Sequence, residues 1–252
     1  EDVPLGRQIV FTFNQAVKEL GQMERDTTDI PITITPTLQC QWRWLDTKSL
    51  ACQLGDENAL KPATRYQIEV KSGIMIESYK KLAKPLKHVF ITQRPSINYT
   101  SFLTWRAPGM PKIRVTFDQT VIRDSVTKHL YFEKPNGEPI TATIELPPNE
   151  DKSLLSTVDS AVWIVAPKML LPLDTKIALK VKPGIQSNLG PELSTEQRTI
   201  VTFQTFPEFQ FVGIGCTNLN NQTIFIQPQQ RIITEHMRCD PLQASNLQFT
   251  SP

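Results

Sequence analysis

Apolar and polar side chains alternate with a period of two along several short runs of this chain. Ile9, Phe11 and Phe13 fall on one face of such a run, and Ile113, Val115 and Phe117 do so 104 residues later (113 − 9 = 104). Successive side chains of a β-strand point to opposite faces of the sheet, so each run predicts a strand with one buried face.

Further runs of the same kind follow each of these two. The expected strands are Tyr66–Val70 and Val89–Thr92 in the first half of the chain, and Ile177–Val181 and Val201–Gln204 in the second. The chain has 20 prolines against 10 glycines, which favours fixed turns over long helices. Only Asp118–His129 and Asp26–Asp29 have sequences that predict a helical turn or two.

The chain repeats itself on the scale of a whole domain. Ile9–Val17 and Ile113–Val121 share Ile, Thr, Phe, Gln and Val in register. Leu60, Thr64 and Val70 recur as Leu171, Thr175 and Val181, with an offset of 111 (171 − 60 = 111). Because solenoid and propeller repeats are only about 20–50 residues long, a period of this length indicates two related domains.

We therefore expect an all-β chain of tandem, antiparallel, immunoglobulin-like β-sandwich domains. The first domain is predicted at 1–95 and the second at 96–207, with 208–252 as a linker and the start of a truncated third β-domain. Within the last region Asn246–Pro252 resembles the opening strand of another repeat, with Phe249 in the place of Phe13. Arg94–Asn98 is the expected connection of a semi-rigid arm, since Pro95 restrains the residue before it.

Charge and hydropathy narrow the range of partners. The chain has 27 basic and 25 acidic residues, so its net charge of +2 gives no reason to expect nucleic acid or an anionic membrane as a partner. No run approaches the roughly 18 apolar residues of a membrane-spanning helix. The chain is therefore expected to be a soluble segment.

The four cysteines fall into two pairs that are close in sequence, Cys40 with Cys52 and Cys216 with Cys239. Residues 41–51 alternate on either side of an Asp46-Thr-Lys turn, and a hairpin there would place the first two sulfur atoms opposite one another. A disulfide in each pair is the favoured interpretation, and buried free thiols are the alternative. Disulfides would indicate an oxidising compartment, either the bacterial periplasm or the outside of a cell.

The search for catalytic chemistry gives no candidate. The chain has no nucleophile elbow, no His-Glu-x-x-His motif and no glycine-rich phosphate loop, and its three histidines are scattered, so no catalytic, cofactor-binding or metal-binding residue is predicted. We accordingly expect a protein that is not an enzyme and needs no cofactor. Trp42 and Trp44 share one strand face and could stack on a sugar, although packing in the core is favoured.

Three stretches resemble the N-terminal macroglobulin domains of bacterial alpha-2-macroglobulins: Val3–Val17, Cys40–Cys52, and Leu60–Tyr66 with its Leu-Lys-Pro-Ala-Thr-Arg-Tyr sequence. The resemblance continues through Val212–Cys216 and Arg238–Pro241 and so covers the whole chain. It implies macroglobulin-type sandwiches in a large periplasmic protein that traps foreign or host proteases as a bacterial defence. Such proteins are often lipoproteins anchored to the inner membrane.

The resemblance also implies partners for the full-length protein and, in some members of the family, a thioester. The expected partners are proteases, which the full-length protein would inhibit as an endopeptidase inhibitor, and other domains of the same chain. Some members of the family carry a Cys-x-Glu-Gln thioester, but here Ser194-Thr-Glu-Gln197 has serine in place of the cysteine, and a polar loop is the simplest interpretation. The expected role of this segment is a non-catalytic scaffold.

Two other classes of function remain open from the residues. The first is a tandem immunoglobulin-like adhesin or spacer that binds a cell-surface or glycan ligand through loops or through Trp42 and Trp44. The second is an accessory binding domain of a carbohydrate-active enzyme. Loops carry the function of many sandwiches, and a single sequence does not indicate which loop does so.

Overall fold

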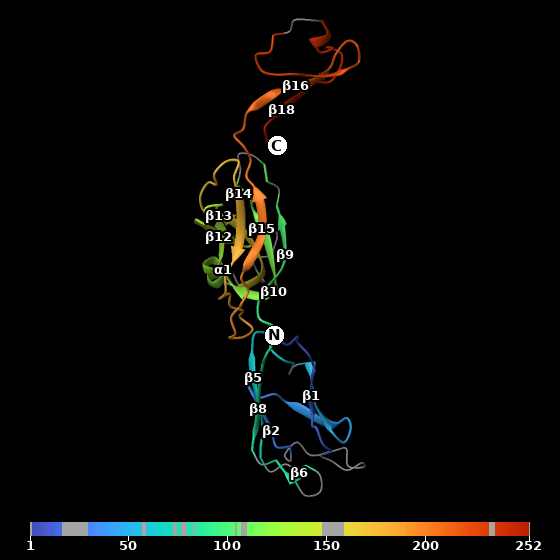
Figure 1. The fold of residues 1–252 in the computed structure, drawn as a ribbon, viewed down its shortest axis with the longest axis vertical. Helices are drawn as coiled ribbons and strands as arrows, with labels where there is room; N and C mark the ends of the chain where they lie inside the picture. The colour runs from blue at the N-terminus through green and yellow to red at the C-terminus, as the bar shows by residue number, and fades with distance from the viewer. Residues whose placement is uncertain are drawn as a thin grey trace.

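The computed structural model describes residues 2–16, 30–56, 59–72, 75–76, 80–82, 84–103, 105–106, 110–147, 159–231 and 235–251. The Asp26–Asp29 turn predicted from the sequence lies outside these residues. Three β-rich regions follow one another along the long axis of the molecule, with the C-terminal region at the far end from β1 (Figure 1). The fold is nearly all β, as the alternating patterns predict.

The first sandwich consists of two three-stranded antiparallel sheets with the orders β1-β4-β3 and β2-β5-β8. These strands are β1 (Gln8–Thr12), β2 (Ile32–Thr35), β3 (Cys40–Trp44), β4 (Ser49–Leu54), β5 (Arg65–Val70) and β8 (Leu86–Ile91). The short pair β6 (Met75–Ile76) and β7 (Lys80–Lys81) adds a small hairpin. The core between the sheets includes Leu50, Leu54, Tyr66 and Ile68. The alternation of Tyr66–Val70 thus correctly predicts the buried face of β5.

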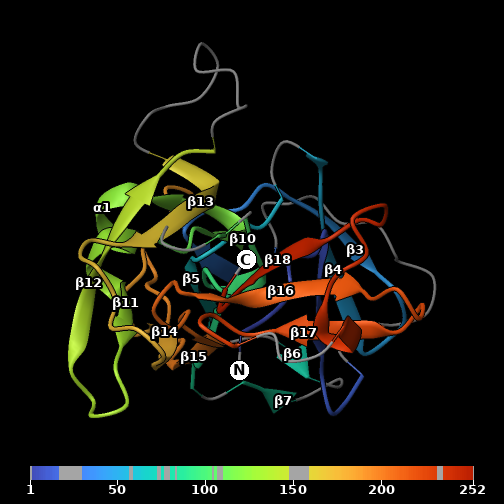
Figure 2. The same cartoon turned by 90° about the horizontal axis from the view of Figure 1, so that it is seen from above.

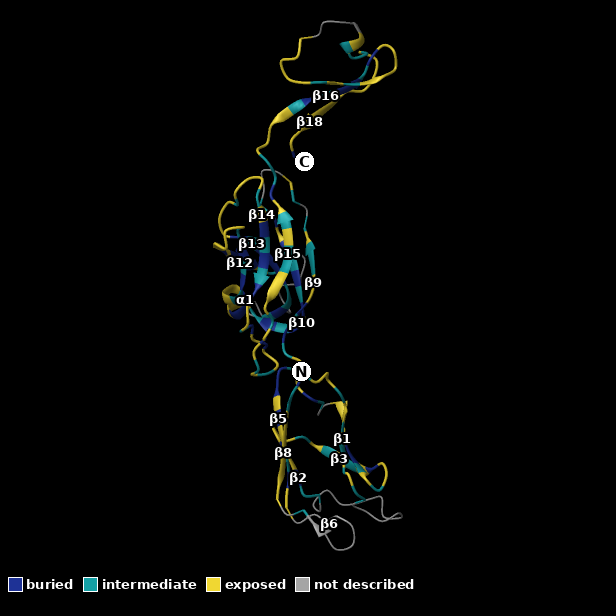
Figure 3. Ribbon diagram, viewed as in Figure 1, coloured by how far each residue is buried: buried dark blue, intermediate teal, exposed yellow. Residues whose placement is uncertain are grey.

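The second sandwich is built on one continuous seven-stranded order, β15-β14-β11-β12-β13-β10-β9. Its strands are β9 (Ile97–Phe102), β10 (Ile113–Ile122), β11 (Leu130–Glu133), β12 (Pro139–Glu145), β13 (Asp159–Pro167), β14 (Lys176–Val181) and β15 (Arg198–Gln204). Trp163, Phe132 and Ile177 are each 0 to 2% exposed and lie at its centre. In Figure 3 the middle region is the most continuously buried of the three.

Two local expectations need correction. The segment Asp118–His129 is helical only from Arg123 onward, as α1 (Arg123–His129), because its first residues continue β10, with Val121 in the core. Helix α1 lies beside β11 and β12 at one side of the molecule (Figure 2). The expected connection Arg94–Asn98 is also shorter than predicted, since β9 begins at Ile97.

The repeat is visible in one hydrogen-bonded corner that occurs in both sandwiches. The hydroxyl of Thr92 accepts a bond from the backbone N–H of Thr64 (2.9 Å), and the hydroxyl of Thr205 accepts one from the N–H of Thr175 (2.8 Å). The residue just before each donating threonine, Ala63 before Thr64 and Asp174 before Thr175, has a positive φ of 47° or 43°. We call this feature the threonine corner. Its recurrence confirms that Thr64 and Thr175 are equivalent positions.

The C-terminal region forms its own three-stranded sheet in the order β17-β16-β18. The strands are β16 (Phe211–Thr217), β17 (Thr223–Ile226) and β18 (Asn246–Phe249), with a short 3-10 turn at Glu235–Met237. Strand β18, the segment in which Phe249 matches Phe13, pairs antiparallel with β16. The N–H of Thr250 donates to the carbonyl of Gln210 at 3.0 Å, so the two ends of this region meet.

Candidate functional site: the junction between the two sandwiches

The first predicted disulfide is present in the hairpin of the first sandwich. Cys40 and Cys52 are bridged, with their Cα atoms 4.8 Å apart. The register pairs Cys40 with Leu54 and Cys52 with Trp42, so the bridge runs diagonally across the hairpin and not between directly opposite residues as expected. The diagonal works because residues two apart point to the same face of a strand.

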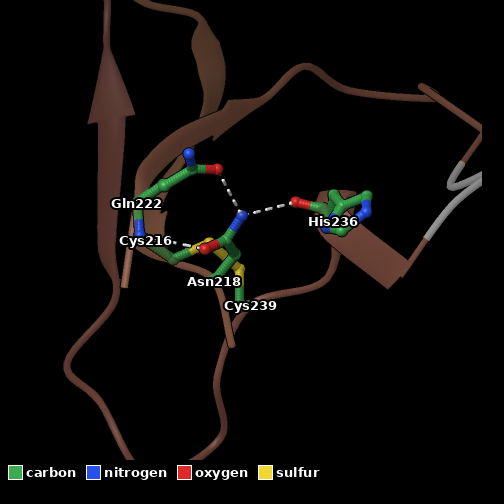
Figure 4. The surroundings of a disulfide bond; sticks show 5 residues. All are labelled: Cys216, Asn218, Gln222, His236 and Cys239. Carbon is green, nitrogen blue, oxygen red and sulfur yellow. Dashed lines mark hydrogen bonds between the residues drawn. A yellow bond between two sulfur atoms is a disulfide. The ribbon is translucent and has the colours of Figure 1, made fainter. Parts of the chain in front are cut away.

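The second predicted disulfide, Cys216 to Cys239, holds the C-terminal sheet, with Cα atoms 5.6 Å apart. Beside it Asn218 is 1% exposed, and its side-chain amide donates to the carbonyl of His236 at 2.9 Å (Figure 4). The amide oxygen of Asn218 accepts the backbone N–H of Gln222 at 2.9 Å. The bridge and Asn218 together tie the segment after β17 back to β16.

The tryptophans that the sequence suggests as a sugar platform contribute to the core of the first sandwich. Trp44 is 7% exposed and packs near Phe13, with ring centroids 6.3 Å apart. Trp42 is partly buried against the same core, and its ring lies 5.7 Å from that of Phe11. The favoured interpretation as core side chains therefore describes both positions.

The Ser194–Gln197 segment acts as a brace between strands. Ser194 is 2% exposed, and its hydroxyl accepts the N–H of Glu196 at 3.2 Å. The carboxylate of Glu196 accepts the N–H of Ile97 at 2.9 Å and pairs with Arg198 at 2.6 Å. These bonds fasten the start of β9 to the start of β15, which fits the polar-loop interpretation.

A charged cluster joins the two sandwiches around Glu192. The carboxylate of Glu192 accepts hydrogen bonds from Nε and Nη2 of Arg65, at 2.8 and 3.1 Å, in the bidentate geometry that suits guanidinium and carboxylate groups. Arg94 reaches the same carboxylate at 3.3 Å and also pairs with Asp2 at 2.6 Å. Glu192 and Arg94 are each less than one fifth exposed. The cluster connects the first sandwich, the linker and the second sandwich.

Backbone contacts hold the same two surfaces together. The N–H of Glu192 donates to the carbonyl of Ala63 at 2.8 Å, directly beside the threonine corner. Gly190 lies so close to this corner that a Cβ atom would overlap the carbonyl oxygens of Pro62 and Ala63. A residue with a side chain could not occupy this position without moving the loop.

The linker itself is fixed on its other side by Asp118 of the second sandwich. This carboxylate accepts the N–H of Ser96 at 3.0 Å, the hydroxyl of Ser96 at 2.8 Å and the side-chain amide of Gln93 at 2.8 Å. The side-chain amide of Gln119 adds a bond to the carbonyl of Gln93 at 3.0 Å. We define the junction as the contacts of Asp2, Ala63, Arg65, Gln93, Arg94, Ser96, Asp118, Gln119, Gly190 and Glu192.

The electrostatics of the junction favour a charged Glu192. Its hydrogen bonds with Arg65, and secondarily with Arg94, lower the pKa of this carboxyl from its ordinary value, and they outweigh the opposite effect of burial. Each partner stabilises the ionised form, so the junction is strongest when Glu192 is deprotonated.

Sequence reasoning missed the junction residues. Glu192 lies 127 residues from Arg65 and 98 from Arg94, so no local spacing connects them. The sequence of the Leu189-Gly-Pro-Glu192 loop predicts only a turn. Its contacts with the first sandwich form when the two sandwiches pack together.

Among the residues that the structure describes, no cluster of three or more His, Cys, Asp or Glu side chains lies together. Nor does any helix in that part of the chain have the length and apolar composition needed to cross a membrane.

The fold and its junction define a tandem β-sandwich arm. Comparison with known proteins confirms the resemblance drawn from the sequence, because the chain is similar to an alpha-2-macroglobulin homolog from Nostoc sp.. The two are 26% identical over 235 residues, which cover 82% of this chain but only 12% of the relative. The chain thus spans about an eighth of the length of that protein. No family model matches the chain.

Proposed function

We propose that this chain is a non-catalytic scaffold segment of a larger alpha-2-macroglobulin-like protein that traps foreign proteases. The observation that carries the proposal is the similarity to an alpha-2-macroglobulin homolog over 82% of the chain. The architecture supports it, since two sandwiches joined through Glu192 and Asp118 form an arm that can hold other domains at a fixed distance and angle.

The compartment and the partners follow from the same proposal. The disulfides Cys40–Cys52 and Cys216–Cys239 favour an oxidising environment, which for a bacterial protein of this kind is the periplasm. The membrane would be reached only through a lipid anchor elsewhere in the parent protein. Proteases would be bound by the whole protein, while this segment contacts its neighbouring domains.

The alternative of an adhesin or spacer has less support. Its ligand was expected at loops or at Trp42 and Trp44, and the rings of both tryptophans pack on the core of the first sandwich. A spacer without a ligand would use the same arm, so an experiment on the parent protein is needed to distinguish a spacer from a protease trap.

The test is carried out on the full-length protein with a broad-specificity protease. A trap leaves cleavage of a small chromogenic peptide intact while cleavage of a large protein substrate falls. If both activities are unchanged, the trap proposal fails and the spacer function is favoured.

Two matched variants ask whether this segment acts as the scaffold. Glu192→Arg places a cation against Arg65 and Arg94 and should weaken protection of the large substrate. Asp56→Arg changes the exposed Arg7–Asp56 pair, where both side chains are more than 60% exposed, and should leave trapping unaltered. Equal trapping by the wild type and both variants would contradict a scaffold role for the junction.

A further inference from the structure

The first sandwich has an apolar seam between its two edge strands, β1 and β8. A cleft of about 490 Å³ opens there, lined among others by Ile9, Phe11, Phe13, Leu60, Leu86 and Phe90. Strand β1 has a hydrogen-bonded neighbour on one side only, β4, and β8 likewise pairs only with β5 among the described strands. Figure 3 shows β8 largely exposed along its length.

The equivalent seam of the second sandwich is filled by β9. This strand pairs antiparallel with the outer edge of β10, the strand equivalent to β1. Ile97 of β9 belongs to the core, and the ring of Phe102 meets that of Phe203 on β15 edge-on, with centroids 5.4 Å apart. Strand β9 therefore bridges β10 and β15, the two strands that correspond to β1 and β8.

The effect of β9 is measurable at repeated positions. Ile113, Val115 and Phe117 are 0, 0 and 3% exposed, whereas their equivalents Ile9, Phe11 and Phe13 are only half-buried. These residues share sequence register and strand type, but among the described strands only the second set lies beside a covering strand.

The N-terminal residues of the chain already lie at one end of the open seam. The N–H of Val3 donates to the carbonyl of Ile91 at 2.8 Å, and the N–H of Gln93 donates to the carbonyl of Val3 at 3.0 Å. Val3 and Thr92 form a parallel bridge. Strand β9 likewise runs parallel to β15, because Ile97 at its start contacts Arg198 and Phe102 at its end contacts Phe203. Traced backwards from Val3, the polypeptide points into the seam.

We propose that the seam is a docking groove for one extended strand. This inference rests on the proposed function, in which the chain is a segment of a larger protein, and it assigns the strand to the residues of that protein that precede Glu1. The strand pairs antiparallel with β1 and runs parallel to β8, as β9 does in the second sandwich. It places apolar side chains into the cleft at alternate positions. The backbone groups of Gln8, Val10 and Thr12 face this groove, because those of the alternate residues Arg7 and Phe13 bond to β4.

The experiment compares the 252-residue chain with a longer native segment that begins roughly a dozen residues earlier, enough for one strand. The longer chain should raise the melting temperature of the first sandwich by about 5 °C or more. It should also lose most of the fluorescence of an apolar dye bound at the seam. Identical melting temperature and dye binding in the two chains would overturn the proposal.

A proline variant separates strand pairing from a general effect of added length. Val10→Pro removes an N–H that faces the groove and spares the bonds to β4, so it should abolish the gain in the longer chain. Val10→Ala keeps the N–H and should retain the gain. An equal gain in both variants would contradict strand pairing at β1.

The source of the strand is tested by concentration. Stabilisation by a segment of the same polypeptide is independent of protein concentration and leaves the chain monomeric. If the seam is instead covered by a second copy, the 252-residue chain will dimerise, Val10→Pro will prevent it, and the proposed source of the strand is wrong.

Discussion

The two sandwiches are copies of one unit, but only in the second does a described strand cover the seam between the two edge strands. The threonine corner, the hydrophobic register of β1 and β10, and the order of the following strands are common to both. The second sandwich closes its seam with β9, whereas the first leaves the same seam open and carries the Cys40–Cys52 bridge. The repeated sequence thus places equivalent strands in both sandwiches, whereas the burial of each strand depends on the strands that pack beside it.

The largest expected effect comes from one residue type at two equivalent positions. Phe117→Ala should cost about 3–5 kcal/mol of unfolding free energy, because the ring is 3% exposed in a closed core. Phe13→Ala should cost about half as much, since that ring is only half-buried beside the seam. Denaturant unfolding that resolves the two sandwiches measures both losses of unfolding free energy. Equal losses would contradict the distinction between a closed and an open core.

The next effect belongs to the first sandwich alone. Replacing Cys40 and Cys52 together by alanine opens a 12-residue loop and should cost about 3 kcal/mol by the loop-entropy estimate. Thermal unfolding should show the first transition moving down while that of the second sandwich stays in place. Movement of both transitions would mean that the sandwiches unfold as one unit.

A smaller and equal effect is expected at the threonine corner. Thr92→Val and Thr205→Val each leave a backbone N–H, of Thr64 or Thr175, without its hydroxyl acceptor, at a cost of about 1–3 kcal/mol. Chemical denaturation of the two variants should give similar losses, each in its own sandwich. A strong inequality would show that the corners are not energetically equivalent.

The smallest expected effect is the loss of stability of the junction at acid pH. The pKa of Glu192 is lowered in the folded protein, so its contribution is fully present above the ordinary carboxyl value near 4.5 and declines as pH falls through the lowered value. Below pH 4.5 the unfolding transitions of the two sandwiches should therefore lie further apart than they do at neutral pH. Glu192→Gln should widen this gap at neutral pH and make it less dependent on pH. Calorimetry across this range checks both results.

The sequence predicts those elements whose side chains alternate cleanly. Ile177–Val181 is a strand with every second residue buried, and the hairpin between Cys40 and Cys52 follows from the alternation around its turn. The helix is predicted too early because Asp118–Ile122 combines polar residues with Val121. The strand continues through this stretch because Val121 pairs with Ser160 and Ile122 with Asp159.

The rest depends on contacts between distant segments. Strand β9 is easily taken for a linker, since Asn98 and Thr100 interrupt its apolar pattern and its pairing partner lies beyond a loop. The junction and the seam are equally hidden from local patterns. Gly190 lies against the carbonyls of Pro62 and Ala63, more than 120 residues away in sequence. Phe13 stays half-buried where no described strand lies beside the free edge of β1.

The most direct test of this comparison is hydrogen exchange in the 252-residue chain. The amides of Arg114 and Thr116 face β9, and their equivalents in β1 are those of Val10 and Thr12, which face the open seam. We expect the β10 pair to be protected and the β1 pair to exchange at least about tenfold faster, since the N–H groups of the β1 pair have no strand partner among the described residues. Equal protection of the two pairs would contradict the view that one sandwich is closed and the other open.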